Sequence, residues 1–303
     1  MYVNWPDHSE TGFGRDVLLA QHNLSMSELF TDEGLAHLLD VYPRESLHIW
    51  TFGSEREGVN SSVRGRAPKL SGKEILEAVK RGHLWLNMRR ANIDVPELAP
   101  IADLIFDTLQ DASGRKTRKR DLSVLISSPN VNVNYHLDIP MVSLFQIRGE
   151  KTIWTYPREE SLAPSDFIED IIHMKREEDL PYRKTFDERA TAFKLKPGMG
   201  LTWPQFMPHR VQNANCMNVS LSCEFQTLNS IVKSNAMYTN GLIRGATPLK
   251  PALNDNIGPV SVAKAAFARA HKAVAGQVPR TPPTPVTFEL DTAEENCVRQ
   301  LYA

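Results

Sequence analysis

Several signatures that would narrow the function are missing from this 303-residue chain. Its three cysteines, Cys216, Cys223 and Cys297, show no CxxC spacing, which argues against a disulfide framework or a cysteine zinc site. The formal net charge of −1 gives no overall attraction to polyanions, so we expect no nucleic-acid partner. Nowhere do eighteen apolar residues follow one another, and no basic segment with an apolar run begins the chain. We therefore expect a soluble, cytoplasmic protein without membrane contact.

Sequence motifs for several common chemistries are also lacking. The chain contains no GxxxxGK[ST], GxGxxG or GxSxG, so phosphate-loop, dinucleotide-fold and serine-hydrolase functions have no support. One basic run, "GRKTRKRD" at residues 114–121, could bind phosphates or an acidic peptide. It lacks interleaved aromatic residues for base stacking, and a solvated loop is the simpler interpretation.

The first 119 residues alternate helical and extended patterns, which predicts an α/β extension. Helices are expected at 31–43, where Thr31 is the N-cap, at 71–82, where Ser71 and Glu74 form a capping box, and at 96–114. Strands are expected at 46–53 and 83–88.

From about residue 120 to 228 the chain consists of short β-branched runs separated by Pro, Gly and Asn, which predicts an antiparallel sandwich or barrel. A charged insertion at 157–189 interrupts these runs, and its stretch 166–180 is expected to be an amphipathic helix. A loop is expected after residue 230. Residues 259–276 then predict a helix whose small-residue stripe suits close packing, either on its own domain or in a homodimer. The stripe consists of Ala263, Ala266, Phe267, Ala270 and Val274.

The segment "VNYHLDIPMVSLFQIRGEK" carries the most informative side chains. In a strand, His136 and Asp138 would share one face, roughly 6 to 7 Å apart along the backbone. Alone, they could equally form a hydrogen-bonded core pair. His209 follows the turn-prone "KPGMG" and begins another β-like run. With it, the three residues match the two-histidine, one-carboxylate set that holds non-haem Fe(II) and leaves coordination positions open.

Lys151 lies in the apolar run "FQIRGEKTIWTY", where an unpaired charge is costly and calls for an anionic partner. Here the sequence resembles the JmjC and cupin-like family of Fe(II)/2-oxoglutarate-dependent oxygenases, especially its asparaginyl hydroxylase (factor inhibiting HIF) type. In that group a lysine thirteen residues after the metal-binding aspartate binds the distal carboxylate of 2-oxoglutarate, and Asp138 and Lys151 have this interval. The resemblance covers roughly residues 120–226, including "PGMGLTWPQFMPHRVQN".

Two positions depart from the family pattern. Val133 stands where the hydroxylase has threonine, and Val142 where it has asparagine, so two secondary contacts to 2-oxoglutarate are lost. Asn134, which shares strand parity with His136, and Ser222, at an inward position of its strand, could replace them or be ordinary core polar residues.

The resemblance implies a mainly β protein with helices: a double-stranded β-helix at 120–228, preceded by the α/β extension at 1–119 and followed by a helical appendage at 229–303. It implies Fe(II) as cofactor and 2-oxoglutarate and dioxygen as co-substrates. The expected activity is hydroxylation of a protein side chain, with demethylation as a variant. A small-metabolite hydroxylase and a non-catalytic, metal-binding regulatory module remain as alternatives.

Overall fold

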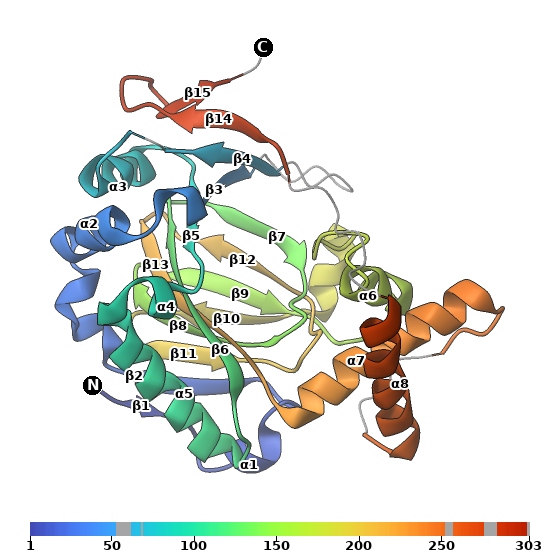
Figure 1. Ribbon diagram of the computed structural model, residues 1–303. Helices are drawn as coiled ribbons and strands as arrows, with labels where there is room; N and C mark the ends of the chain where they lie inside the picture. Colours follow the sequence, from blue (N-terminus) through green and yellow to red (C-terminus); the bar gives the residue numbers. More distant parts are fainter. Residues whose placement is uncertain (53–61, 68, 252–256, 276–283, 302–303) are drawn as a thin grey trace.

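Two β-sheets form the centre of the computed structural model, which describes residues 1–52, 62–67, 69–251, 257–275 and 284–301 (Figure 1). The larger sheet has the strand order β1-β2-β11-β8-β13-β6-β5-β3-β4-β14-β15, and the smaller has the order β10-β9-β12-β7. The strands are β1 (Val3–Asn4), β2 (Leu18–His22), β3 (Leu47–Phe52), β4 (Ser62–Arg66), β5 (Trp85–Met88), β6 (Arg118–Ser127), β7 (Asn132–His136), β8 (Met141–Arg148), β9 (Lys151–Thr155), β10 (Thr191–Leu195), β11 (Met199–Thr202), β12 (His209–Asn213), β13 (Asn218–Gln226), β14 (Val286–Leu290) and β15 (Val298–Gln300).

The strands from β6 to β13 pass repeatedly between the two sheets. Strands β6, β8, β11 and β13 lie in the larger sheet, and β7, β9, β10 and β12 make up the smaller one. Apolar side chains from both sheets, among them Val142 and Leu144 on β8 and Ile153 and Leu195 on the smaller sheet, pack in one buried cluster. The two sheets therefore enclose a common interior.

Helices cover the outer face of the larger sheet. Their apolar side chains share one core with outward-facing strand residues such as Val124 and Val219. Three expected helices are confirmed, since Thr31 caps the first, the Ser71–Glu74 capping box begins the second, and Gly114 ends the third with a φ of 60°. The helices are α1 (Ser9–Gly12), α2 (Asp32–Val41), α3 (Gly72–Arg81), α4 (Ala91–Asp94), α5 (Ala99–Ser113), α6 (Ser165–Ile172), α7 (Leu228–Ala246) and α8 (Pro259–Ala275).

The helix expected at 166–180 is shorter than its pattern indicates. Helix α6 ends at Ile172, and Met174 has a φ of 56°, which turns the chain out of the helix. The following residues instead pair with β7, because the N–H of Leu180 donates to the carbonyl of Tyr135 at 3.0 Å. Helix α6 packs through Ile168 onto the cluster on the outer side of the smaller sheet.

The loop expected after residue 230 was wrong: α7 is a 19-residue helix. Its start has a local signal that the sequence interpretation overlooked, since Thr227 and Ser230 form a reciprocal capping box. Helix α7 extends away from the sheets between α6 and α8 (Figure 1).

Helix α8 is present, but its expected packing face was wrong. The side chains of the predicted small-residue stripe are exposed, with Phe267 at 52% and Val274 at 90%, whereas Ala265 and Ala268 are buried. The helix docks on α7 of its own chain, where the Thr239 hydroxyl donates to the Lys264 carbonyl at 2.7 Å. This arrangement does not support the homodimer contact expected through this helix.

The segment 229–303, expected to be helical, also contains strands. Strand β14 runs parallel to β4 and β15 antiparallel to β14, so this segment completes one side of the larger sheet. Within the ranges that the structure describes, none of the helices is long and apolar enough to span a membrane.

Candidate metal centre

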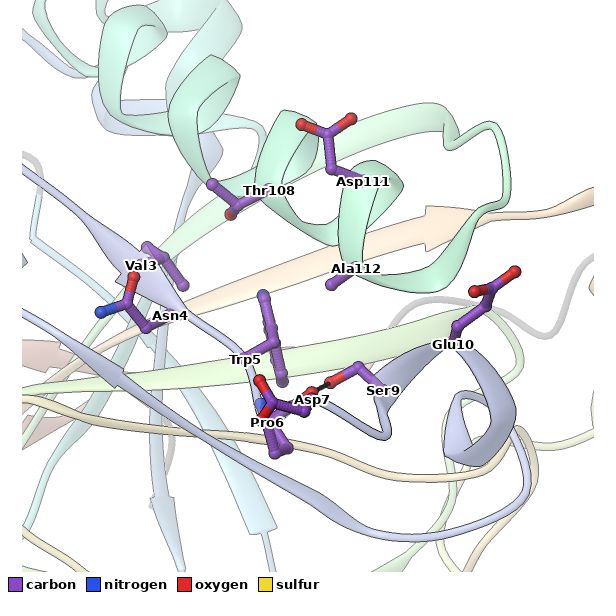
Figure 2. Close-up of a pocket in the computed structure, with 10 residues that line it drawn as sticks. All are labelled: Val3, Asn4, Trp5, Pro6, Asp7, Ser9, Glu10, Thr108, Asp111 and Ala112. Carbon is purple, nitrogen blue, oxygen red and sulfur yellow. Dashed lines mark hydrogen bonds between the residues drawn. The ribbon is translucent and has the colours of Figure 1, made fainter.

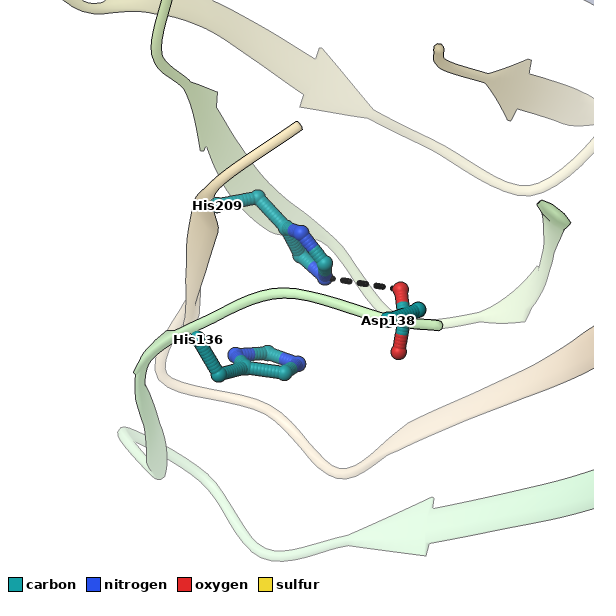
Figure 3. A group of neighbouring side chains, drawn as sticks. All are labelled: His136, Asp138 and His209. Carbon is teal, nitrogen blue, oxygen red and sulfur yellow. Dashed lines mark ion pairs between the residues drawn. The ribbon is translucent and has the colours of Figure 1, made fainter. Parts of the chain in front are cut away.

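His136, Asp138 and His209 converge at one end of the two-sheet interior (Figure 3). His136 is the last residue of β7, His209 is the first of β12, and the two are paired across these neighbouring strands. Asp138 lies beyond the end of β7 rather than within the strand that the sequence predicted. One ligand atom from each residue lies within 4.8 Å of the others, which is a spacing that one metal ion can bridge.

Backbone contacts orient both imidazole rings. Nδ1 of His136 lies 2.6 Å from the carbonyl oxygen of Asn134, and Nδ1 of His209 lies 3.1 Å from that of Met207. A carbonyl accepts only from a protonated Nδ1, so this pairing leaves the Nε2 lone pairs for a ligand. Nε2 of His209 lies 3.4 Å from Oδ2 of Asp138.

The electrostatics of this group fit a divalent cation. Burial raises the pKa of Asp138, and burial together with the nearby His136 ring holds the pKa of His209 well below its usual value. Oδ2 of Asp138 is buried without a hydrogen-bond partner in the described part of the chain. A cation would supply the missing partner. Two imidazole nitrogens and one carboxylate suit Fe(II), and also nickel, zinc or manganese.

Lys151 lies on the same interior but at the opposite end of β9. It pairs with Leu195 of β10, which belongs to the interior cluster, and is four residues from Thr155, the partner of His209. That separation is about 13 Å along the strand. The Lys151 side chain is 6% exposed, forms no ion pair or hydrogen bond with the described residues, and burial lowers its pKa to about 8.

Neutral polar side chains on β8, β12 and β13 are already paired with other neutral groups. The amide nitrogen of Gln146 donates to Oδ1 of Asn218 at 2.7 Å, and its oxygen accepts from the hydroxyl of Ser220 at 2.7 Å. Asn213, the β12 neighbour of Lys151, donates to the hydroxyl of Ser127 at 2.8 Å. These amides and hydroxyls carry no charge that would neutralise the ammonium group, so the site calls for an anionic ligand.

The two other residues predicted to contact 2-oxoglutarate, Ser222 and Asn134, lie in different environments. Ser222 pairs with Leu144, so it lies on the interior face as expected. Asn134 is 4% exposed, and its Nδ2 has no hydrogen-bond partner among the described residues. The direction of the Asn134 side chain was expected from the strict alternation of side chains along a strand. A register shift between β7 and β12 interrupts this alternation, and Val133 pairs with Val211 next to the shift.

The sequence interpretation overlooked an acid beside the metal centre. Glu224 lies two residues after Ser222 on β13 and pairs with Val142, which places it on the same interior face. Burial and the nearby Asp138 carboxylate raise the pKa of Glu224 to about 7. The alternation of "NVSLSCEF" is the signal that could have identified it.

The charged insertion returns to the metal-binding strand. His136 forms an isolated antiparallel bridge with Asp179, and the N–H of Leu137 donates to the carbonyl of Glu178 at 3.3 Å. A short piece of the insertion thus pairs with the edge of β7 beside two of the three candidate ligands.

A separate hollow of about 460 Å³ lies between the N-terminal residues and α5 (Figure 2). Trp5 stands at its centre, and exposed carboxylates, including those of Glu10 and Asp111, surround it. None of its lining residues belongs to the candidate metal centre, so we do not place the chemistry there.

No known family model and no curated protein matches this sequence. Among solved structures, YcfD from E. coli has a TM-score of 0.50 with 15% identity, covering 90% of this chain and 70% of YcfD. A structure of YcfD from Escherichia coli, described as a ribosomal oxygenase in complex with cobalt and 2-oxoglutarate, has a TM-score of 0.48 with 16% identity, covering 89% and 67%. At such low identity the likeness to YcfD shows a shared fold.

Proposed function

We propose that this protein is an Fe(II)- and 2-oxoglutarate-dependent dioxygenase that hydroxylates a protein side chain. The observation that carries the proposal is the pairing of two sites in one interior. The His136, Asp138 and His209 group lies at one end, and the buried ammonium of Lys151 lies at the other. A dicarboxylate that binds a metal at one end and a cation at the other suits both sites.

We infer that the eight strands from β6 to β13 form a double-stranded β-helix at about 120–228. Their distribution over two sheets, with chain crossings between them, supports this assignment. Residues 1–119 then form an extension whose strands β3, β4 and β5 lengthen one sheet, and residues 229–303 an appendage of helices and two strands.

Each proposed site residue has a distinct role. His136, Asp138 and His209 would hold Fe(II), while Lys151 would pair with the distal carboxylate of 2-oxoglutarate. The bound iron would supply dioxygen activation coupled to oxidation of 2-oxoglutarate to succinate and carbon dioxide. The protein's own contribution is orientation, through the two Nδ1 contacts to backbone carbonyls, and exclusion of water from the buried interior. Ser222 and Asn134 are proposed as further 2-oxoglutarate contacts.

A protein side chain is the proposed substrate for two reasons. The sequence motifs resemble those of the asparaginyl hydroxylase type, and YcfD is described as a ribosomal oxygenase. Demethylation of a methylated residue and hydroxylation of a small metabolite use the same centre and are variants of this proposal.

A non-catalytic metal-binding module is the second candidate. It is favoured by Val133 and Val142, two apolar residues where the asparaginyl hydroxylase type has polar contacts to 2-oxoglutarate. Val142 lies on the interior face between the sheets, so the change affects the expected co-substrate site directly.

One experiment separates the two candidates. 2-Oxoglutarate is titrated into the Fe(II)-loaded protein without oxygen, and the visible metal-to-ligand charge-transfer absorption is recorded, with Lys151→Ala as the matched variant. We expect a saturable band in the wild type that requires much more 2-oxoglutarate in the variant. If Fe(II) binds but no band develops, the oxygenase assignment is wrong and the metal-binding module is favoured. An equal requirement in both proteins would contradict the role of Lys151.

A further inference from the structure

Helix α8 exposes an apolar face that no described part of the chain covers. The helix lies at the edge of the molecule, where it crosses α7 away from both sheets (Figure 1). Its inner side packs there through Ala265 and Ala268. The outward face consists of nine exposed apolar residues: Pro259, Val260, Val262, Ala263, Ala266, Phe267, Ala270, Ala273 and Val274. With 3.6 residues per turn they fall within about 160° of the helix circumference, so they form one continuous stripe.

This outward face differs from an ordinary solvated helix surface. Val260 is 69% exposed and Val274 90%, with Phe267 between them. A surface helix normally turns charged residues toward water, and soluble monomers rarely leave a continuous apolar patch exposed unless it is an interaction site. The alanines leave the middle of the face flat, so the axis of another helix could approach closely.

Only cations border the outward face. Arg269 lies along one side of it and Lys264 along the other, and Lys272 follows one turn after Arg269. The ammonium groups of Lys264 and Lys272 donate to the neutral side-chain oxygens of Asn240 at 2.6 Å and Asn235 at 3.1 Å. Neither α7 nor α8 contains an aspartate or glutamate. These three cations therefore form no ion pair with any carboxylate of the two helices.

A second copy of this chain does not complement the outward face. Two α8 helices packed face to face would bring the same cations together, and neither helix would supply a carboxylate. Like charges beside an apolar seam oppose helix pairing. The neighbouring strand adds positive charge, since burial and the nearby Lys119 of β6 lower the pKa of Lys272. The face therefore suits a partner that carries carboxylates beside its own apolar stripe.

An anionic membrane would match the charge but not the shape of this face. Helices that bind in the membrane interface rely on large apolar side chains, whereas four of the nine positions here are alanine. Small residues along the middle of a face favour close contact with another helix instead.

We propose that the outward face of α8 binds an amphipathic helix of another protein that carries carboxylates on both sides of its apolar stripe. The stripe packs on the alanines of α8 beside Phe267 and Val274, and the carboxylates face Arg269 and Lys264. This surface is separate from the candidate metal centre, and the proposal does not rest on the oxygenase assignment.

The test uses two synthetic helical peptides, each about three heptads long, with the same stripe of leucine and alanine. One peptide has glutamate at the positions that flank the stripe, and the other has lysine there. Each is labelled and titrated with the full chain, and fluorescence anisotropy is recorded. We expect saturable binding of the glutamate peptide, at least about tenfold tighter than that of the lysine peptide. Its affinity should fall as the salt concentration rises.

Two variants examine the face and its border separately. Ala270→Glu places a carboxylate in the middle of the apolar stripe, and Arg269→Glu reverses the charge at its side. We expect each to bind the glutamate peptide at least about tenfold more weakly. The matched controls are Val41→Glu, at an exposed apolar position on α2, and Lys73→Glu, at an exposed cation on α3, which should bind as the wild type does. Thermal midpoints confirm that the variants are folded.

Three results would overturn the proposal. Equal binding of the two peptides, or equal weakening by Ala270→Glu and Val41→Glu, would show that the outward face does not select an acidic helix. A wild-type dimer in sedimentation that Ala270→Glu dissociates would assign the face to a second copy. Binding to vesicles of phosphatidylglycerol and phosphatidylcholine that Ala270→Glu abolishes would assign it to a membrane. The 2-oxoglutarate titration is independent of all three results, so the two proposals can fail separately.

Discussion

Replacing Lys151 with Met should stabilise the ligand-free protein while removing its affinity for 2-oxoglutarate. Lys151 is 6% exposed, and the pKa of its ammonium falls to about 8 from an ordinary value of 10.5. The difference of about 2.5 pKa units corresponds to about 3 kcal/mol, since each unit is worth about 1.4 kcal/mol. Met fills most of the same volume without a charge, so this cost should disappear in the variant.

The stability difference between the wild type and Lys151→Met should depend on pH. Because the folded-state pKa of Lys151 lies below the unfolded one, the unfolded chain binds more protons between about pH 8 and 10.5. The penalty is therefore fully present below pH 8 and is lost as the pH rises toward 10.5. The wild-type free energy of unfolding should rise relative to that of Lys151→Met over this interval, and the two should then converge.

Urea denaturation of the metal-free proteins at pH 7 and pH 10 measures this difference, with the exposed Lys194→Met on the neighbouring strand β10 as control. We expect Lys151→Met to gain about 3 kcal/mol at pH 7 and much less at pH 10. With iron present, 2-oxoglutarate at about a hundred times its Kd should stabilise only the wild type, by about 3 kcal/mol. A variant no more stable than wild type at pH 7 would refute the reasoning.

Three other perturbations test separate parts of the structure. Asp138→Ala removes one of three ligands and should abolish saturable Co(II) binding followed by visible absorption; retained tight binding would contradict the metal centre. Thr227→Ala removes the cap of α7 and should cost about 1 kcal/mol in urea denaturation, and an unchanged midpoint would show that this helix end needs no cap. Arg244→Ala leaves the Glu169 carboxylate, 2% exposed, without its 2.6 Å partner, and should cost about 3 kcal/mol; a loss below about 1 kcal/mol would argue against a buried ion pair.

Local signals in the sequence predicted the parts of the fold that local interactions determine. The capping box at Ser71 and Glu74 identified α3 correctly, and the one at Thr227 and Ser230 would have identified α7 in the same way. The helical pattern of the sequence could not predict the early end of α6. The residues after Met174 pair with β7, and this contact between separate segments forms only in the tertiary structure.

The sequence likewise predicted only part of the candidate metal centre. The types and order of His136, Asp138 and His209 were sufficient to propose a metal site, since few other arrangements need that donor set. The side of β7 on which Asn134 lies was not predictable, because the register shift against β12 depends on how two distant strands align. Glu224 was visible in the alternation of its strand, but only the paired strands show that it lies near Asp138.

The parallel pairing of β14 with β4 has a practical consequence for handling the protein. Strand β14 occupies the hydrogen-bonding edge that β4 would otherwise present, and β15 beyond it is short and carries Arg299, which pairs with Glu289. An uncovered strand edge is a template for intermolecular pairing, whereas a short charged one resists it. Removing the residues from 284 onward would expose the edge of β4. Recombinant versions that end before residue 284 should therefore self-associate when they are concentrated. Purification tags are better placed away from β14 and β15.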